Sequence, residues 1–174
     1  MSRRIVITEP DPRWPAVFAS IRDRILPAFS GMAVHIEHIG STAVAGLAAK
    51  PIIDLVVVVP SVRLVPDAIE RLAFLGYEHE GDLGVPGREA FRGPTPDPAH
   101  HLYLSPSDSP SLAAHLRFRD ALRADPALAA EYATLKRLLA ATVGPDRAAY
   151  VAGKSAFVEA VLIRDSRDGT LRAG

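Results

Sequence analysis

The sequence predicts an α+β fold, in which a half of mixed strands and helices is followed by a half that is helical throughout. Apolar, β-branched segments typical of strands alternate with one-sided helical patterns as far as residue 105. Beyond that point, apolar residues recur every three or four positions. We therefore expect an α/β core over 1–105, a helical segment packed on it over 106–164, and a flexible polar tail over 165–174.

The first half opens with a short strand or extended arm at Ile5–Ile7. A helix is expected from Asp11–Pro12 to near Pro27, because a capping residue followed by proline is typical of a helix start. Strands are expected over 34–39 and 52–59. The second is β-branched and apolar on both faces, which favours a central position in the sheet.

The rest of the first half is predicted from turn residues and periodicity. In chain order we expect a helix over 66–75 capped by Gly76, a weak strand over 77–79, a long loop over 81–98 with a strand at 89–92, and a strand over 101–104.

Three helices are expected in the second half. The first is capped by Ser109 or Ser111 and runs to about Arg123. The second begins at Asp125–Pro126 and is broken at residues 144–146. In the third, apolar and basic positions step by four, three and four along one face, at Tyr150, Lys154, Phe157 and Val161.

Composition excludes several classes of function. The chain has 174 residues and no cysteine, so disulfides, thiolate metal sites and thiol nucleophiles are excluded. Lysine plus arginine equals aspartate plus glutamate at 20 each, so a nucleic-acid partner is not expected. The longest apolar run, 52–59, is interrupted by Asp54 and is too short to span a membrane. A cytoplasmic protein without a membrane partner is expected.

The turn Gly40-Ser41-Thr42 follows the first strand and precedes a short helix expected over 43–49. Its spacing matches neither a Walker loop nor a dinucleotide-binding fingerprint. Either hydroxyl residue can cap the short helix, and the N–H groups at such a start attract anions. The turn is therefore a candidate phosphate site, with an ordinary capped turn as the alternative.

Asp54 is a carboxylate within an apolar strand, where it shares a face with Ile52, Val56 and Val58. Burying an unpaired carboxylate is unfavourable, so a partner is expected. That partner is a cation, a metal, or backbone N–H groups of the Gly40–Ser41 turn. The structural alternative is a carboxylate that only fixes the neighbouring turn.

His101 and Tyr103 are expected to project from one face of their strand. His38, at the end of the first strand, can join them. Imidazole ligands favour zinc, manganese or nickel over magnesium. Asp54, His101 and His38 are therefore candidate metal ligands, although adjacent histidines also occur in plain surface strands.

Cationic side chains are concentrated in the helical half, for example in the runs 116–120 and 135–137. The candidates for holding a phosphate-bearing ligand are Lys50, Arg92, Arg119, Lys136 and Lys154. Solvated helix faces with local ion pairs are the alternative.

Several segments together resemble the bacterial GrpB family, in order over residues 5–164. They are D-P-R-W-P, I-E-H-I-G-S-T-A-V-A-G-L-A-A-K-P-I-I-D-L, A-H-H-L-Y-L, L-R-F-R-D-A-L-R-A-D-P, E-Y-A-T-L-K-R-L-L-A and Y-V-A-G-K-S-A-F-V. The resemblance implies a nucleotidyltransferase-like fold, with a mixed sheet flanked by helices and then a C-terminal helical segment. It also implies relatives joined to dephospho-CoA kinase domains.

In active nucleotidyltransferases the Gly-Ser turn binds phosphates and three carboxylates hold metal ions. On that pattern, Gly40, Ser41 and Thr42 match the phosphate-binding turn and Asp54 matches the first carboxylate. Val56 occupies the second carboxylate position. The strand of His101 and Tyr103 is expected at the third, where family members often have a second histidine in place of the tyrosine.

Two functions follow as expectations. In the first, the cleft binds a nucleotide or another phosphate-bearing small molecule and transfers a nucleotidyl group. Asp54 and His101 are then catalytic, and a single Mg, Mn or Zn ion is bound with His38 as a further ligand. In the second, the protein is a non-catalytic binding or accessory module for a partner enzyme, for example in CoA metabolism. A purely structural scaffold is a weaker third reading.

Overall fold

The computed structural model describes residues 5–94 and 98–172, with side chains as far as residue 164. Within these residues, five strands form a single sheet in the order β1-β2-β5-β4-β3. The strands are β1 His35–Ile39, β2 Ile53–Val59, β3 Glu78–Gly81, β4 Glu89–Arg92 and β5 His100–Pro106. The strand expected at 89–92 is confirmed at those residues.

The sheet is mixed. β1 runs antiparallel to β2, whereas β2 and β5 are parallel. β4 is antiparallel to both β5 and β3. β2 therefore lies between two strands, as its β-branched and apolar sequence predicted, and all of its residues except Asp54 are buried.

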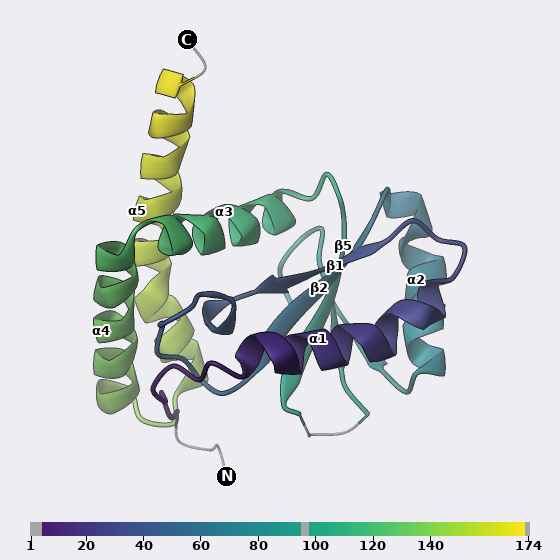
Figure 1. The fold of residues 1–174 in the computed structure, drawn as a ribbon, viewed down its shortest axis with the longest axis horizontal. Helices are drawn as coiled ribbons and strands as arrows, with labels where there is room; N and C mark the ends of the chain where they lie inside the picture. The colour runs from purple at the N-terminus through teal and green to yellow at the C-terminus, as the bar shows by residue number, and fades with distance from the viewer. Residues whose placement is uncertain (1–4, 95–97, 173–174) are drawn as a thin grey trace.

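Helices cover both faces of this sheet (Figure 1). The helical elements are α1 Trp14–Ile25, η1 Leu26–Phe29, η2 Ser41–Ala43, η3 Val62–Leu64, α2 Val65–Phe74, α3 Pro110–Ala124, α4 Pro126–Thr142 and α5 Arg147–Arg172. Of the two candidate caps for α3, Ser109 is the one whose side chain accepts a hydrogen bond, from the N–H of Leu112. Asp125 caps α4 in the same way. The expected α+β architecture is confirmed.

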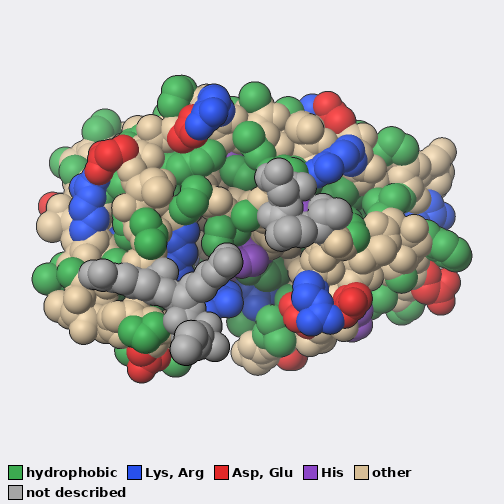
Figure 2. Space-filling model, turned by 90° about the horizontal axis from the view of Figure 1, so that it is seen from below, with side chains coloured by type: hydrophobic (Ala, Val, Ile, Leu, Met, Phe, Trp, Pro, Cys, Tyr) green, Lys and Arg blue, Asp and Glu red, His purple; other side chains and the backbone are tan. Residues whose placement is uncertain are grey.

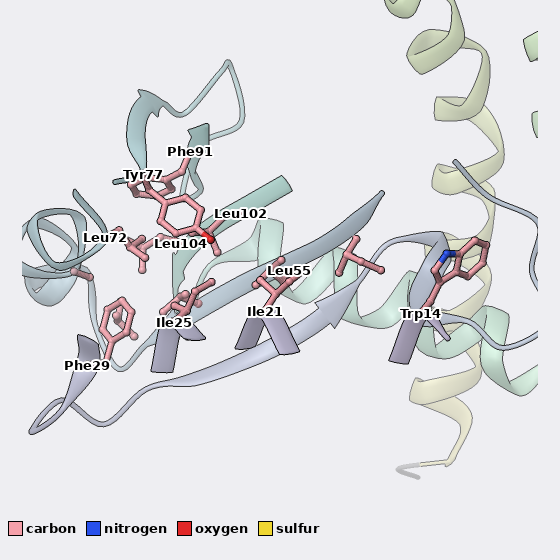
Figure 3. Packing of buried hydrophobic residues seen from close by; sticks show 14 of the residues in the cluster. Trp14, Ile21, Ile25, Phe29, Leu55, Leu72, Tyr77, Phe91, Leu102 and Leu104 are labelled. Atoms are coloured by element: carbon pink, nitrogen blue, oxygen red, sulfur yellow. The ribbon is translucent and has the colours of Figure 1, made fainter. Parts of the chain in front are cut away.

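The main core lies between the sheet and the helices α1 and α2. Ile21 and Ile25 of α1 pack toward Leu55, Leu102 and Leu104 of the two central strands (Figure 3). Each of these side chains is almost completely buried. Burial of one such side chain contributes about 1.5–3 kcal/mol, so this face supplies much of the driving force that fixes the sheet.

The opposite face of the sheet carries a smaller core beneath α3. Ile39, Val56 and Val58 pack there against Leu112. Because successive side chains in a strand alternate between faces, Asp54 lies on this α3 side together with Val56 and Val58. The carboxylate is thus placed under the helical segment rather than under α1.

Aromatic side chains join the three C-terminal helices. The Tyr132 ring of α4 stacks on Phe157 of α5, with centroids 5.1 Å apart. Phe118 of α3 meets Tyr132 edge to face, also at 5.1 Å. Such pairs contribute about 0.5–1.5 kcal/mol beyond area burial, and they hold α3, α4 and α5 as one unit beside the sheet (Figure 1).

Some local expectations differ from the structure. The short helix expected over 43–49 is wrong: the chain makes a single 3₁₀ turn, Ser41–Ala43, and then reverses at Gly46, where φ is +75°. In the described part of the N-terminal arm, Thr8 forms an isolated β-bridge, in which it exchanges backbone hydrogen bonds with Ala49. This pairing holds Ala49 extended and prevents a helix there.

At the other end of the chain, the backbone of 165–172, where a flexible tail is expected, continues α5 as far as Arg172. None of the helices in the described residues combines the length and the apolar content needed to cross a membrane.

Candidate functional site

The turn after β1 approaches Asp54 closely. Gly40 has φ of +70°, and a Cβ added to it would lie 2.5 Å from Asp54 Oδ2. Only glycine tolerates both the left-handed backbone and this contact. The turn and the carboxylate are therefore fixed against each other, with Ser41 at the start of the 3₁₀ turn beside them.

Asp54 is also paired across the sheet with His101. The parallel register places Asp54 of β2 directly beside His101 of β5, and His101 Nδ1 lies 2.8 Å from Asp54 Oδ1. The imidazole N–H donates to the carboxylate, so Nδ1 carries the hydrogen of this bond. The Asp54 side chain remains 28% exposed and the His101 side chain 37% exposed, so both are accessible to solvent.

The residues around this pair do not fit a two-metal centre. Val56, at the second carboxylate position of the nucleotidyltransferase pattern, is buried and lies beside Tyr103 of β5. Among the described residues, no group of three or more His, Cys, Asp or Glu side chains is arranged to hold a metal ion. A two-magnesium site relies on several carboxylates, and one aspartate already bonded to an imidazole does not supply them.

The cleft above the pair is strongly cationic. A cavity of about 520 Å³ lies between the sheet and the C-terminal helices, and Asp54 is the single carboxylate among the described residues that line it. The cations that line it are Lys50, Arg88, Lys136, Arg147 and Lys154. Seen from below, Lys or Arg side chains and a histidine lie recessed near the middle of the molecule (Figure 2). With five basic side chains and one carboxylate in this lining, the local charge favours an anion over a cation.

Two of the lysines share one aromatic ring. Lys50 Nζ and Lys154 Nζ lie 4.5 and 4.6 Å from the centroid of the Tyr150 ring. Burial lowers the pKa of both amines, and Arg147 near Lys50, together with Lys50 near Lys154, lowers them further. These ammonium groups are partly desolvated, so they gain more from a bound anion than exposed lysines would.

Lys136 occupies the most buried position in this group. It is only 2% exposed, and its Nζ donates to Ser41 Oγ at 2.9 Å and to the carbonyl of Ala48 at 2.5 Å. Burial, followed by the charges of Lys154 and Arg137, lowers its pKa to about 7. Lys136 thus joins α4 to the turn that begins at Gly40.

Of the residues proposed from the sequence, Ser41, Thr42, Lys50, Asp54, His101, Lys136 and Lys154 line this cleft, and Gly40 lines an adjoining cavity. Thr42 is nevertheless buried, and its hydroxyl donates to the carbonyl of Ile52 and meets His38 Nε2 at 3.0 Å. Its side chain is already engaged within the protein.

His38, Arg92 and Arg119 differ from these. The ring of His38 stacks on Phe18 of α1, on the far side of the sheet from Asp54, so the structure does not bring it to the proposed metal ligands. Arg92 is exposed on β4 and pairs with Glu78, outside the cleft. Arg119 lines an adjoining cavity rather than this cleft, and its guanidinium donates hydrogen bonds to Glu37, Asp120 and the carbonyl of His38.

Several cleft residues were not proposed from the sequence. Arg88 and Val85 come from the loop between β3 and β4, which is anchored where Ser109 Oγ donates to the carbonyl of Gly87 at 2.7 Å. The Arg88 guanidinium lies over the Tyr103 ring at 4.4 Å. Arg147 and His115 come from the helical segment. No local sequence pattern marks these four residues as cleft residues, because only the tertiary fold brings them near Asp54.

Comparison with known proteins agrees with this fold. The model of the family described as GrpB protein matches residues 4–164. The crystal structure of conserved protein GrpB from Enterococcus faecalis superposes with a TM-score of 0.80, at 33% identity over 94% of this chain and 98% of that one. The expected α+β class, with a mixed sheet flanked by helices and followed by a helical segment, is confirmed by the strand order and by this superposition.

Two curated relatives are longer proteins. UPF0157 protein YqkA of Bacillus subtilis is 34% identical over 157 residues, which are 90% of this chain and 46% of the relative. A dephospho-CoA kinase of Mycolicibacterium paratuberculosis is 28% identical over 85% of this chain and 42% of the relative. The chain thus spans less than half the length of either.

Proposed function

This chain belongs to the GrpB protein family, and from that premise we propose that its cleft binds a small molecule bearing two or more phosphate groups. The observation that carries the proposal is the charge of the lining, in which five basic side chains surround Asp54, the one carboxylate in the described part of that lining. A nucleotide is one such ligand.

Partial desolvation of the lysines supports the same ligand. Burying an ammonium group without an anion is unfavourable, and Lys136 Nζ contacts a hydroxyl, a carbonyl and the Tyr132 ring, none of which carries a negative charge. A phosphate group in the cleft supplies the missing negative charge. Charge-assisted hydrogen bonds to phosphate are about twice as strong as neutral ones, so such a ligand offsets the cost of this burial.

We do not extend the proposal to nucleotidyl transfer. The Asp54–His101 pair lacks the further carboxylates that the two-metal reaction needs, since Val56 occupies one of those positions. The residues present therefore fit ligand binding better than they fit nucleotidyl transfer.

A second candidate is an accessory role beside an enzyme of CoA metabolism. It is favoured by the likeness of this chain to part of a protein named dephospho-CoA kinase. A ligand with both a diphosphate and a nucleotide portion, such as dephospho-CoA, would satisfy this role and the charge of the cleft together.

Isothermal titration with inorganic pyrophosphate, ATP and dephospho-CoA tests both candidates, in chelator and in magnesium. Two variants from the same hairpin provide a matched comparison. Arg88→Gln removes a cleft cation, and we expect affinity to fall about tenfold or more. Arg92→Gln removes an exposed cation outside the cleft, and we expect no change.

Tighter binding of dephospho-CoA than of ATP would favour the accessory role. Absence of binding by all three ligands, or equal losses in the two variants, would refute the phosphate-binding cleft.

A further inference from the structure

A second compartment adjoins the cationic cleft. Its volume is about 460 Å³, and it shares with the cleft the residues Ser41, Asp54, Val85, His115 and Lys154. The two spaces therefore adjoin along these residues, and a ligand that extends past them would occupy both. A cavity of this size lies in the range that holds small organic molecules, about 300–1,000 Å³.

The lining of this compartment is largely apolar. The apolar side chains that border it but not the cationic cleft are Ala114, Phe118 and Leu122 of α3, Tyr132 of α4 and Val158 of α5. Arg119 also borders it, but its guanidinium is committed to Glu37 and Asp120. The compartment thus adds apolar surface to the cleft without adding an uncommitted cation.

Two polar side chains, Ser111 and His115, also line the compartment. Ser111 Oγ is buried and has no hydrogen-bond partner among the described residues, although buried hydroxyls normally have one. His115 Nδ1 lies 2.7 Å from the Ser111 carbonyl, to which it donates. Burial lowers the pKa of His115 and so favours the neutral ring, in which Nε2 is a hydrogen-bond acceptor.

We propose that this compartment receives the non-phosphate part of the ligand: an uncharged, mostly apolar aryl or branched alkyl group that carries one hydroxyl or N–H. The apolar lining holds the carbon skeleton, and the hydroxyl or N–H forms a hydrogen bond with Ser111 Oγ, beside the His115 ring. The inference rests on the proposed function, because the phosphate groups must occupy the adjoining cleft.

Three probes separate the two parts of the site. They are inorganic pyrophosphate, 2-phenylethyl diphosphate and 2-(4-hydroxyphenyl)ethyl diphosphate, each titrated calorimetrically in chelator. Pyrophosphate reports on the cationic cleft alone. We expect the phenylethyl ester to bind about tenfold or more tightly than pyrophosphate, and its hydroxyl to add a further gain of about threefold to tenfold.

Two alanines of α3 provide matched variants. Ala114→Leu adds bulk inside the compartment, and we expect it to abolish the gain from the phenyl group while leaving pyrophosphate affinity unchanged. Ala113→Leu adds the same bulk on the exposed side of α3 and should alter neither. Ser111→Ala should remove only the gain from the hydroxyl.

The titrations separate a failure of the apolar subsite from a failure of the phosphate-binding cleft. If pyrophosphate binds but the phenyl ester binds no more tightly, or if the full gain survives in Ala114→Leu, the apolar subsite is refuted and the phosphate-binding cleft stands. If a gain from the phenyl group is lost in Ala114→Leu but the hydroxyl adds nothing, the polar part of the inference is refuted. If pyrophosphate itself does not bind, the proposed function fails and the inference fails with it.

Discussion

The Lys136 ammonium on α4 lies 2.9 Å from Ser41 Oγ, in the turn that follows β1. The two residues are 95 positions apart in the sequence. The hydrogen bonds recorded for Lys136 go to a hydroxyl and to the carbonyl of Ala48, so its charge is buried without a carboxylate bonded to it. This contact positions a titratable cation against the turn beside Asp54.

The buried Lys136 should make stability depend on pH. Its pKa is about 7 in the folded protein and near 10.5 in the unfolded chain. Between these values the unfolded state binds more protons, so the free energy of unfolding should rise with pH across the window from about 7 to 10.5. We expect a contribution of at most ~1.4 kcal/mol per pH unit. Lys136→Met should remove it.

Urea denaturation of the native protein and of Lys136→Met at pH 7, 8 and 9 measures this difference. Arg63→Met, which removes an exposed cation far from the cleft, should retain the native dependence on pH. If the free energy of unfolding changed with pH by the same amount in the native protein and in Lys136→Met, the pKa of Lys136 would not be lowered in the folded protein.

Gly40 and Gly46 form a matched pair for testing the turn. Both have positive φ, at +70° and +75°, but only a Cβ at Gly40 meets another atom, Asp54 Oδ2. Alanine at either position should lower stability by about 1 kcal/mol or more through backbone strain. Gly40→Ala should also displace Asp54 and change pyrophosphate affinity, whereas Gly46→Ala should leave the affinity unchanged. Denaturation and calorimetry of both variants provide the comparison, and equal affinities in the two would refute the role of this close contact.

Much of the sheet was predictable because its signals are local. The β-branched and apolar sequence of β2 predicts a central strand, and alternation along that strand places Asp54 on the same face as Val56 and Val58. The caps of α3 and α4 follow from Ser109 and Asp125 for the same reason.

The composition of the cleft was less predictable, because it depends on tertiary contacts. Arg88 reaches the cleft through a loop anchored on Ser109, and Arg147 through the start of α5. The helix expected over 43–49 is absent because Ala49 pairs instead with Thr8, 41 residues earlier. Long-range pairing of this kind overrides local helical preference.

Asp54→Asn should strengthen anion binding measured in chelator. Asp54 is the single carboxylate among the described residues that line the cationic cleft, so it repels a phosphate group bound there. At separations of about 6 Å and an effective dielectric constant near 20, one pair of charges contributes about 3 kcal/mol. We expect pyrophosphate affinity to rise about tenfold or more. The change should also lower stability by about 1–3 kcal/mol, because the bond to His101 loses its charged acceptor.

Asp67→Asn, on the exposed surface of α2, serves as the control for Asp54→Asn and should leave affinity unchanged. Weaker pyrophosphate binding by Asp54→Asn in chelator would contradict the electrostatic account, because it would mean that the carboxylate assists the anion.

His38 should act as an acid-sensitive structural residue rather than as part of the cleft. Burial, together with the charges of Arg123 and Arg119, lowers its pKa from 6.5 to about 4. Between these values the unfolded state binds more protons, so the protein should lose stability as pH falls from about 6.5 to 4. His38→Gln keeps a partner for Thr42 and removes the titration, and the variant should lose about 1–3 kcal/mol less stability than the native protein over that interval.

Chemical denaturation at pH 6.5, 5.5 and 4.5 measures the effect of His38→Gln on stability, and calorimetry at pH 7 should give unchanged pyrophosphate affinity. A marked loss of affinity in His38→Gln would instead place His38 in the binding site, despite its stacking on Phe18.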